Sequence, residues 1–164
     1  MTKPVAAPLW RKSLAIGTAA GVLLGVGLAA AERAQLTVDQ VTDFSASSAS
    51  GMFRFAPDMI RVAPGETVTF LNSRGSHTVK AQKGFWPDRV EPVDIAGQTR
   101  ADVTFDQPGI YGVTCARHGK YGMVMLVAVG DAAPTEEDFA RVAALPASDR
   151  AKAGYLRLLE AFPG

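Results

Sequence analysis

The sequence has one cysteine and two histidines, and these fall into one pattern with one of the five methionines. His118 follows Cys115 by three residues and Met123 follows His118 by five, which gives the spacing C-x2-H-x4-M. His77 comes earlier, in a loop after a predicted strand that ends at Leu71. Any one of these residues alone is weak evidence, because single Cys and Met side chains usually only fill space in a core. Together they bring every thiol and imidazole of the chain into one set of metal-binding side chains.

This set suits copper, which must be bound both as Cu(I) and as Cu(II) if it is to carry electrons. Soft sulfur and borderline imidazole ligands are compatible with both oxidation states. A thiolate from Cys115 and nitrogens from His77 and His118 make a trigonal set, and the Met123 thioether supplies a weak, long axial bond. A site that hardly changes shape between oxidation states passes electrons with little rearrangement. The four residues therefore predict one copper ion in a type 1 site.

Other chemistries suit these residues less well. A structural zinc site takes more Cys or His, methionine is a poor zinc ligand, and hydrolytic zinc keeps one position open for water. A Ser-His-Asp arrangement would need a histidine that is not already used, and a multicopper oxidase needs many more histidines. We therefore expect no enzymatic activity. Three kinds of protein remain: a diffusible electron carrier, a copper delivery or storage protein with the same fold, and a metal-free sandwich that acts as an interaction module.

Short strands separated by turns must position these ligands. Residues 67–71 and 101–105 alternate apolar and polar side chains, as half-buried strands do. Further strands are expected at residues 36–38, 59–62, 110–114 and 123–129. Pro64-Gly65 and Pro108-Gly109 mark turns between them. Many short strands with Pro-Gly turns predict a mainly-β protein with a Greek-key β-sandwich over residues 32–131.

After Gly130 the pattern becomes helical. Thr135 can cap a helix whose first turn holds three acidic residues, which suits the positive end of a helix. Pro146 ends this helix and Ser148 can cap a second one, so two helices are expected within residues 134–163. The second helix has a stripe of apolar residues at helical spacing. The stripe, which is expected to pack on the sandwich, consists of Ala151, Tyr155, Leu158, Leu159 and Phe162.

The first 31 residues are typical of a secretory signal peptide. Three basic residues begin the segment, and an apolar run follows from Leu14 to Ala31 and ends in three alanines. We expect cleavage between Ala31 and Glu32 and export to the periplasm of a Gram-negative bacterium. An uncleaved membrane anchor is the alternative, because the run is about long enough to span a bilayer.

The charge of the chain excludes bulk nucleic-acid binding. Loss of residues 1–31 leaves 14 basic and 16 acidic side chains and a net charge of −2, whereas nucleic-acid binding requires a basic excess. We also expect a monomer without stable membrane association after cleavage. Five basic side chains could share the copper face and steer an acidic partner, although an ordinary solvated surface explains them equally well. These candidates are Arg74, Lys83, Arg89, Arg117 and Lys120.

From about residue 52 to residue 164 the sequence resembles the cupredoxins, and among them the pseudoazurins. The resemblance rests on MIRVAPGETVTF at 59–70, YGVTC at 111–115, HGKYGM at 118–123 and VAVGD at 127–131. The spacing C-x2-H-x4-M also occurs in plastocyanins, but the two C-terminal helices are typical of pseudoazurins. The resemblance implies a periplasmic carrier that shuttles single electrons between c-type cytochromes and a reductase such as copper nitrite reductase. It also implies that His118 is the partly exposed ligand, within an apolar surface patch that docks on partners.

Two residues next to the predicted ligands depart from the family pattern. Thr78 follows the first histidine ligand where the family usually has Asn, and Arg117 precedes the second where the family usually has Pro. Side chains of this kind, which brace ligands without binding the metal, tune a metal site. Thr78 can offer its backbone N–H to the Cys115 sulfur and its hydroxyl to the ligand loop. Arg117 places a charge beside the exposed ligand, and we expect it to raise the reduction potential and alter the choice of partner.

Overall fold

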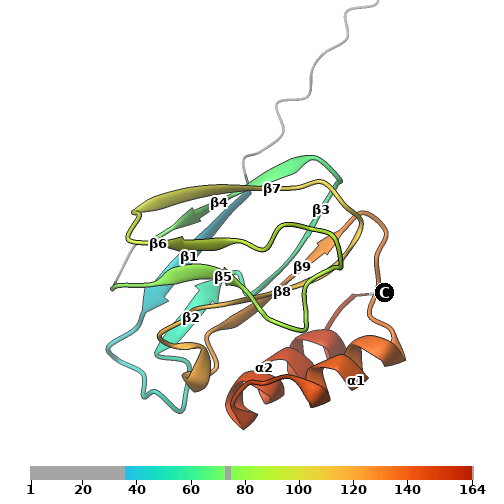
Figure 1. The fold of residues 1–164 in the computed structure, drawn as a ribbon. Coiled ribbons are helices and arrows are strands. Elements are labelled where there is room, and N and C mark those ends of the chain that lie inside the picture. Colours follow the sequence, from blue (N-terminus) through green and yellow to red (C-terminus); the bar gives the residue numbers. More distant parts are fainter. Residues whose placement is uncertain (1–35, 73–74, 164) are drawn as a thin grey trace, which may run out of the picture. The chain divides into compact units, whose positions relative to one another are not determined.

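The structure, a computed structural model, describes residues 36–72 and 75–163 (Figure 1). Within these residues the strands form two sheets, a four-stranded sheet in the order β2-β1-β4-β7 and a five-stranded sheet in the order β3-β9-β8-β5-β6. The strands are β1 (Leu36–Thr42), β2 (Phe53–Ala56), β3 (Met59–Val62), β4 (Glu66–Leu71), β5 (Thr78–Ala81), β6 (Asp94–Ala96), β7 (Arg100–Phe105), β8 (Gly109–Thr114) and β9 (Val124–Val129). The predicted mainly-β sandwich is therefore confirmed. The predicted signal peptide, residues 1–31, lies outside the described residues.

Alternating side chains build the core between the two sheets. In β7 every second residue is buried, and in β4 Val68 and Phe70 are completely buried. β4 pairs with β7 in the antiparallel register that sets Phe70 opposite Ala101, so the apolar sides of both strands face the same way. β1 pairs with β4, and β3 with β9, in parallel. Neighbouring strands are thus often distant in the chain, as in a Greek key.

Three strands were not anticipated from the sequence. β2, β5 and β6 have only four, four and three residues, which is too short for an alternating pattern to stand out. β3 is equally short, but the Pro64-Gly65 turn that follows it marks its end. β2 ends at Ala56, directly before Pro57, and pairs with β1 at one edge of its sheet. The boundaries of β9 also differ from the expectation: the strand begins at Val124, so Met123 belongs to the preceding loop.

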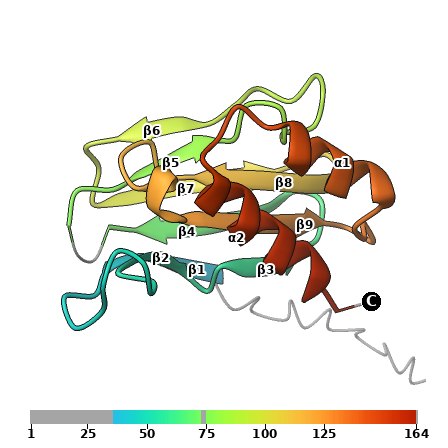
Figure 2. The ribbon, with the colours of Figure 1, turned by 90° about the horizontal axis from the view of Figure 1, so that it is seen from below.

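Two helices pack on the five-stranded sheet over β8 and β9 (Figure 2). α1 (Glu136–Ala144) begins with the expected cap, since Thr135 and Asp138 form a capping box. α2 (Asp149–Glu160) begins at Ser148, whose side chain accepts a hydrogen bond from the Ala151 N–H. The predicted stripe of α2 faces the sheet: Ala151, Tyr155, Leu158 and Leu159 are buried, and Phe162 is partly buried beside them. In the part of the chain that the structure describes, no helix is long and apolar enough to cross a membrane.

Candidate metal centre

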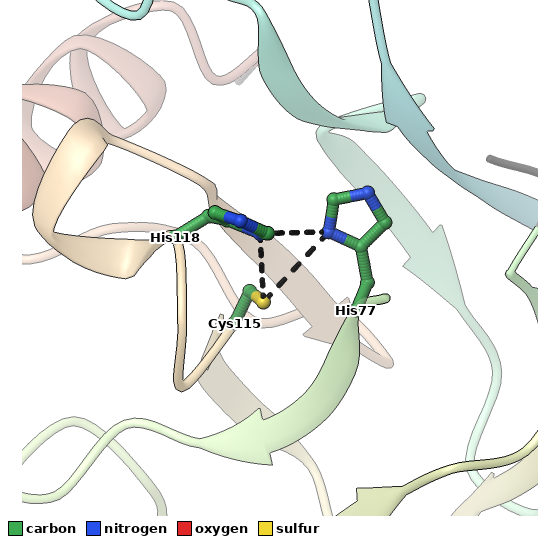
Figure 3. Close-up of side chains that lie close together, drawn as sticks. All are labelled: His77, Cys115 and His118. Atoms are coloured by element: carbon green, nitrogen blue, oxygen red, sulfur yellow. Dashed lines mark hydrogen bonds between the residues drawn. The ribbon is translucent and has the colours of Figure 1, made fainter. Parts of the chain in front are cut away.

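Three of the predicted ligands converge at one end of the sandwich (Figure 3). His77 directly precedes β5, Cys115 directly follows β8, and His118 lies in the loop that joins β8 to β9. The Cys115 Sγ lies 3.9 Å from the His77 Nδ1 and 3.7 Å from the His118 Nδ1. The two Nδ1 atoms are 3.0 Å apart. One sulfur and two imidazole nitrogens thus face a common point.

The spacing of these atoms fits a bound metal ion. Imidazole nitrogen and thiolate sulfur bind first-row metals such as zinc at about 2.0 Å and about 2.3 Å, so trigonal ligands stand about 3.7 Å apart for N and S and about 3.5 Å for two N. The observed N–S distances agree, and the two nitrogens need to separate by only about half an ångström. Two unprotonated nitrogens at 3.0 Å would repel each other, so one of them carries a proton when no metal is bound, or a cation lies between them. A thiolate with two imidazoles is the donor set that copper selects.

Met123, the fourth predicted ligand, closes the same loop. Its side chain is completely buried in the core cluster that contains Cys115. The Cys115 N–H donates to the Met123 carbonyl at 3.1 Å, and the Met123 N–H donates to the His118 carbonyl at 3.2 Å. The residue before it, Gly122, adopts a left-handed conformation with φ 92°, which glycine takes without strain. The backbone bonds therefore hold Met123 against both ligands that come from its own loop.

A short 3-10 helix, η1 (Gly119–Tyr121), shapes the loop between Cys115 and Met123. The Gly119 N–H donates to the Cys115 carbonyl at 2.7 Å, and the Tyr121 N–H donates to the His118 carbonyl at 2.9 Å. The loop spans neighbouring antiparallel strands, because Thr114 of β8 stands opposite the first residue of β9. The sequence spacing therefore becomes a fixed arrangement of side chains.

Thr78, which was proposed to brace the site, contacts both the Cys115 sulfur and the ligand loop. Its hydroxyl lies 3.8 Å from the Cys115 sulfur and accepts a hydrogen bond of 2.8 Å from the Ala116 N–H. The residue is buried, so water does not compete for these groups. Thr78 thereby ties the beginning of β5, beside His77, to the beginning of the ligand loop.

The surroundings of Cys115 favour its thiolate. Burial by itself raises the pKa of the thiol, but a hydrogen bond from His77 and hydrogen bonds from three backbone N–H groups outweigh it and lower the pKa to about 6. The three N–H groups are those of Thr78, His118 and Arg117. At neutral pH the sulfur is therefore ready to bind a metal without first losing a proton.

Comparisons with known proteins agree with this geometry. The family described as copper binding proteins, plastocyanin/azurin family, matches residues 42–130, a range that includes His77, Cys115, His118 and Met123. The chain belongs to this family. Its members are cupredoxins, which bind one copper ion, and the donor set described above suits that ion.

Pseudoazurins are among the similar proteins. The chain is 39% identical to the pseudoazurin of Paracoccus pantotrophus over 101 residues, which cover 62% of this chain and 69% of that protein. It is 41% identical to the pseudoazurin of Methylorubrum extorquens over 85 residues, which cover 52% of this chain and 57% of that protein. The latter alignment therefore spans little more than half the length of that relative.

Solved structures of pseudoazurins share the fold of this cupredoxin. The crystal structure of pseudoazurin from Methylobacterium extorquens AM1 superposes with a TM-score of 0.63 at 29% identity, covering 77% of this chain and 98% of that chain. Native pseudoazurin from Hyphomicrobium denitrificans gives a TM-score of 0.66 at 25% identity, covering 80% and 100%. The superposed length of this chain includes more than the sandwich alone, in agreement with the pseudoazurin-like helix pair.

The basic side chains proposed for docking are dispersed in this cupredoxin. Arg117 and Lys120 are exposed in the ligand loop on either side of His118, and the Lys120 Nζ lies 5.0 Å from the centre of the Tyr121 ring. Arg89 lines a cleft with Pro108, just before β8 begins, whereas Cys115 follows its far end. Six strand residues separate the two ends by about 20 Å, so Arg89 is not at the copper end.

The remaining two docking candidates are Lys83 and Arg74. Lys83 is exposed and follows Gln82, which lines a small cleft together with Cys115 and Lys120. Arg74 lies outside the described residues. Of the predicted set, Arg117 and Lys120 thus lie in the ligand loop itself, and Lys83 follows a residue that lines a cleft with Cys115.

Two residues beside the ligands were not anticipated from the sequence. The Thr42 Oγ1 lies 2.9 Å from the His77 Nε2, and the Phe53 ring stacks on the His118 ring with centroids 3.9 Å apart and planes 10° apart. Both residues lie at least 24 positions before the first ligand, and neither belongs to a motif. Their positions beside the two histidines follow only from the folded structure, in which β1 pairs with β2.

The low pKa of Cys115 leads to a titration experiment. We expect the ultraviolet absorption of the thiolate in the metal-free protein to appear with a midpoint at about pH 6. In urea the same thiol should titrate near pH 8.5, the usual value for an unfolded chain. Because the folded pKa is the lower one, the thiolate stabilises the fold fully above about pH 8.5. This contribution is lost as pH falls to 6.

The unfolded chain is the internal control for this titration, since it has the same single thiol. Copper affinity should be insensitive to the thiol proton above pH 6 and should weaken below it, where copper must displace that proton. Equal midpoints in the folded and unfolded protein would contradict the hydrogen-bonded thiolate.

Proposed function

We propose that this cupredoxin carries single electrons in the periplasm, with one copper ion held by His77, Cys115, His118 and Met123. The observation that carries the proposal is the set of one sulfur and two nitrogens within 4.8 Å of one another at one end of the sandwich. Copper supplies the one-electron change between Cu(II) and Cu(I). The chain supplies ligands from two separated loops, so the donor set exists only in the folded protein.

The burial of the ligands suits a carrier. His77, Cys115 and Met123 are at most 2% exposed, whereas His118 is only partly buried. Hydrogen bonds from the sandwich hold the buried ligands, which limits rearrangement when the copper changes its oxidation state. The imidazole of His118 is then the shortest bonded route between the metal and a partner protein. We infer that electrons enter and leave through its edge.

Copper delivery or storage is the alternative function for the same fold. Delivery requires ligands that exchange readily with a partner, but three of the four predicted ligands are buried. The chain also has no further cysteine or histidine that could bind a copper ion transiently during its transfer to a partner. The similar proteins named above are pseudoazurins, and we propose an electron carrier without enzymatic activity.

We propose c-type cytochromes as electron donors and copper nitrite reductase as an acceptor. The support comes from the resemblance to pseudoazurins, together with the location of His118 at the surface of a buried donor set. Measuring electron exchange with both kinds of partner side by side tests this proposal. Fast exchange with a cytochrome but not with nitrite reductase would leave the carrier role intact and remove the proposed acceptor.

Charge around His118 should govern how quickly such a partner docks. Lys120→Gln removes one exposed positive charge from the ligand loop, and Arg89→Gln removes one from the opposite end of β8. We expect Lys120→Gln to slow electron exchange with an acidic cytochrome roughly threefold at low ionic strength, because complementary charges steer the encounter. The difference should vanish in high salt, where exposed charges are screened.

Arg89→Gln is the matched control, since both variants change the net charge equally. It should exchange electrons at the rate of the unchanged protein. Equal slowing by both variants would mean that only net charge matters. If the rate of electron exchange does not depend on ionic strength in any variant, electrostatic docking at the copper end is excluded.

A further inference from the structure

One pair of opposite residues, in strands that contribute no ligand, contacts both histidines of the site. Thr42, the last residue of β1, stands opposite Phe53, the first residue of β2. Residues directly opposite in an antiparallel pair project their side chains to the same side of the sheet. Thr42 reaches His77 and Phe53 reaches His118. The two imidazoles therefore contact the two side chains of a single residue pair between β1 and β2.

Thr42 fixes the ring of His77. The Nδ1 of His77 faces Cys115 and His118, so the Nε2 carries the N–H when Nδ1 binds a metal and donates to the Thr42 hydroxyl at 2.9 Å. His77 and Thr42 are 2% and 5% exposed, so water cannot replace this bond. A hydrogen bond at the second ring nitrogen sets the tautomer and the orientation of a metal-binding histidine.

Gly75 leaves the space that this contact needs. Its φ is 85°, and a Cβ atom placed there would lie 2.6 Å from the Thr42 Oγ1 and 3.1 Å from the His77 Nε2. A side chain at this position would therefore push the hydroxyl away from the imidazole.

Phe53 restrains the other imidazole. Its ring lies parallel to that of His118, with the centroids 3.9 Å apart, and it covers one face of a ligand that is otherwise only partly buried. The Tyr121 ring lies 5.7 Å from Phe53. Stacked aromatic contacts of this kind contribute beyond the area they bury, so the His118 ring is held against rotation from outside its own loop.

We propose that the Thr42–Phe53 pair positions both imidazoles and thereby sets the copper affinity and reduction potential of the site. This proposal rests on the copper site proposed above. Cu(I) tolerates fewer ligands than Cu(II), so an imidazole that is free to turn away favours Cu(I) and raises the reduction potential. The pair opposes that movement on both sides of the metal position. Thr42 and Phe53 are thus positioning residues, which act on copper through the histidines.

The test compares variants that remove each contact with variants that retain it. Thr42→Val deletes the hydroxyl at nearly constant volume, and Thr42→Ser retains it. Phe53→Leu deletes the ring, and Phe53→Tyr retains it. We expect Thr42→Val to weaken copper binding about 10- to 100-fold, the usual effect of losing a partner of a metal ligand. Thr42→Ser should restore most of the affinity, and Phe53→Leu should raise the reduction potential.

Val41→Ala and Arg54→Leu are the matched controls. These two residues form the next pair of the same ladder, and their side chains point to the opposite side of the sheet. Copper affinity is measured by competition with a chelator, the potential by voltammetry, and the ligand geometry by electron paramagnetic resonance. Thermal unfolding of each metal-free variant separates loss of fold from loss of positioning.

The outcomes separate this proposal from the proposed function. If the unchanged protein binds no copper, the proposed function fails. If it binds copper but Thr42→Val and Phe53→Leu keep its affinity, potential and resonance spectrum, only the positioning role is overturned. The same conclusion holds if Thr42→Ser loses as much affinity as Thr42→Val. Should Thr42→Val fail to fold, Phe53→Leu against Phe53→Tyr decides the question through the potential and the spectrum.

Discussion

Replacing Cys115 with serine is expected to abolish the intense visible absorption of the copper-loaded protein. The absorption arises when an electron moves from the thiolate sulfur to Cu(II), so it requires a sulfur bound to the metal. The thiol is buried and its pKa of about 6 keeps it ionised at neutral pH. A serine hydroxyl stays protonated and is a hard ligand, which copper binds less well than sulfur. Visible spectra and copper content of the two proteins measure the effect.

Met125→Leu is the control for this experiment. Met125 is completely buried in the same core cluster as Cys115 and Met123, but it lies in β9, beyond the ligand loop. Replacing its sulfur should leave the visible absorption in place. Met125 is not one of the predicted ligands, and leucine nearly conserves its volume in the core. A Cys115→Ser protein that keeps the intense band would show that another group binds the copper.

Replacing Tyr155 with alanine is expected to lower the free energy of unfolding by about 3–5 kcal/mol, the usual effect of removing a large buried aromatic side chain. Tyr155 is completely buried between α2 and the five-stranded sheet. Its ring packs edge-on against Phe85 with centroids 5.4 Å apart. Its hydroxyl donates a 2.8 Å hydrogen bond to the carbonyl of Val113, two residues before Cys115. Urea unfolding of the metal-free protein measures the loss.

Tyr155→Phe separates the two contributions of this side chain. It retains the ring but leaves the Val113 carbonyl without its partner, which should lower stability by about 1–3 kcal/mol. Leu156→Ala on the less buried side of α2 should have the smaller effect of a partly exposed site. If Tyr155→Ala unfolds at the same urea concentration as the unchanged protein, the helices do not stabilise the sandwich.

The four ligands could be proposed from sequence because their chemistry is rare. The chain has one thiol and two imidazoles, and spacing alone relates Cys115, His118 and Met123. The strands β4 and β7 were predictable for a different reason, since their apolar and polar residues alternate in the sequence; β7 buries every second residue, whereas β4 buries Thr69 as well as Val68 and Phe70. The caps at Thr135 and Ser148 were predictable because their hydroxyls accept from N–H groups three residues further along the same chain.

Contacts between distant segments could not be predicted in this way. Thr42 lies 35 residues before His77, and no local pattern shows that β1 ends beside a metal ligand. In the sequence Phe53 is an ordinary apolar residue. Its position beside His118 follows only from the pairing of its strand with β1. Arg89 and Lys120 are both basic, but the length of β8 separates them. Pairing across the sheet, which is long-range information, decides all three positions.

Copper binding by the purified protein is the most direct test of an electron carrier. Addition of Cu(II) is expected to produce an intense visible band that saturates at one copper ion per chain. One electron per chain should then bleach the band, and reoxidation should restore it. A protein that stays colourless with added Cu(II), or that takes up copper without a band that one electron removes, would contradict the account.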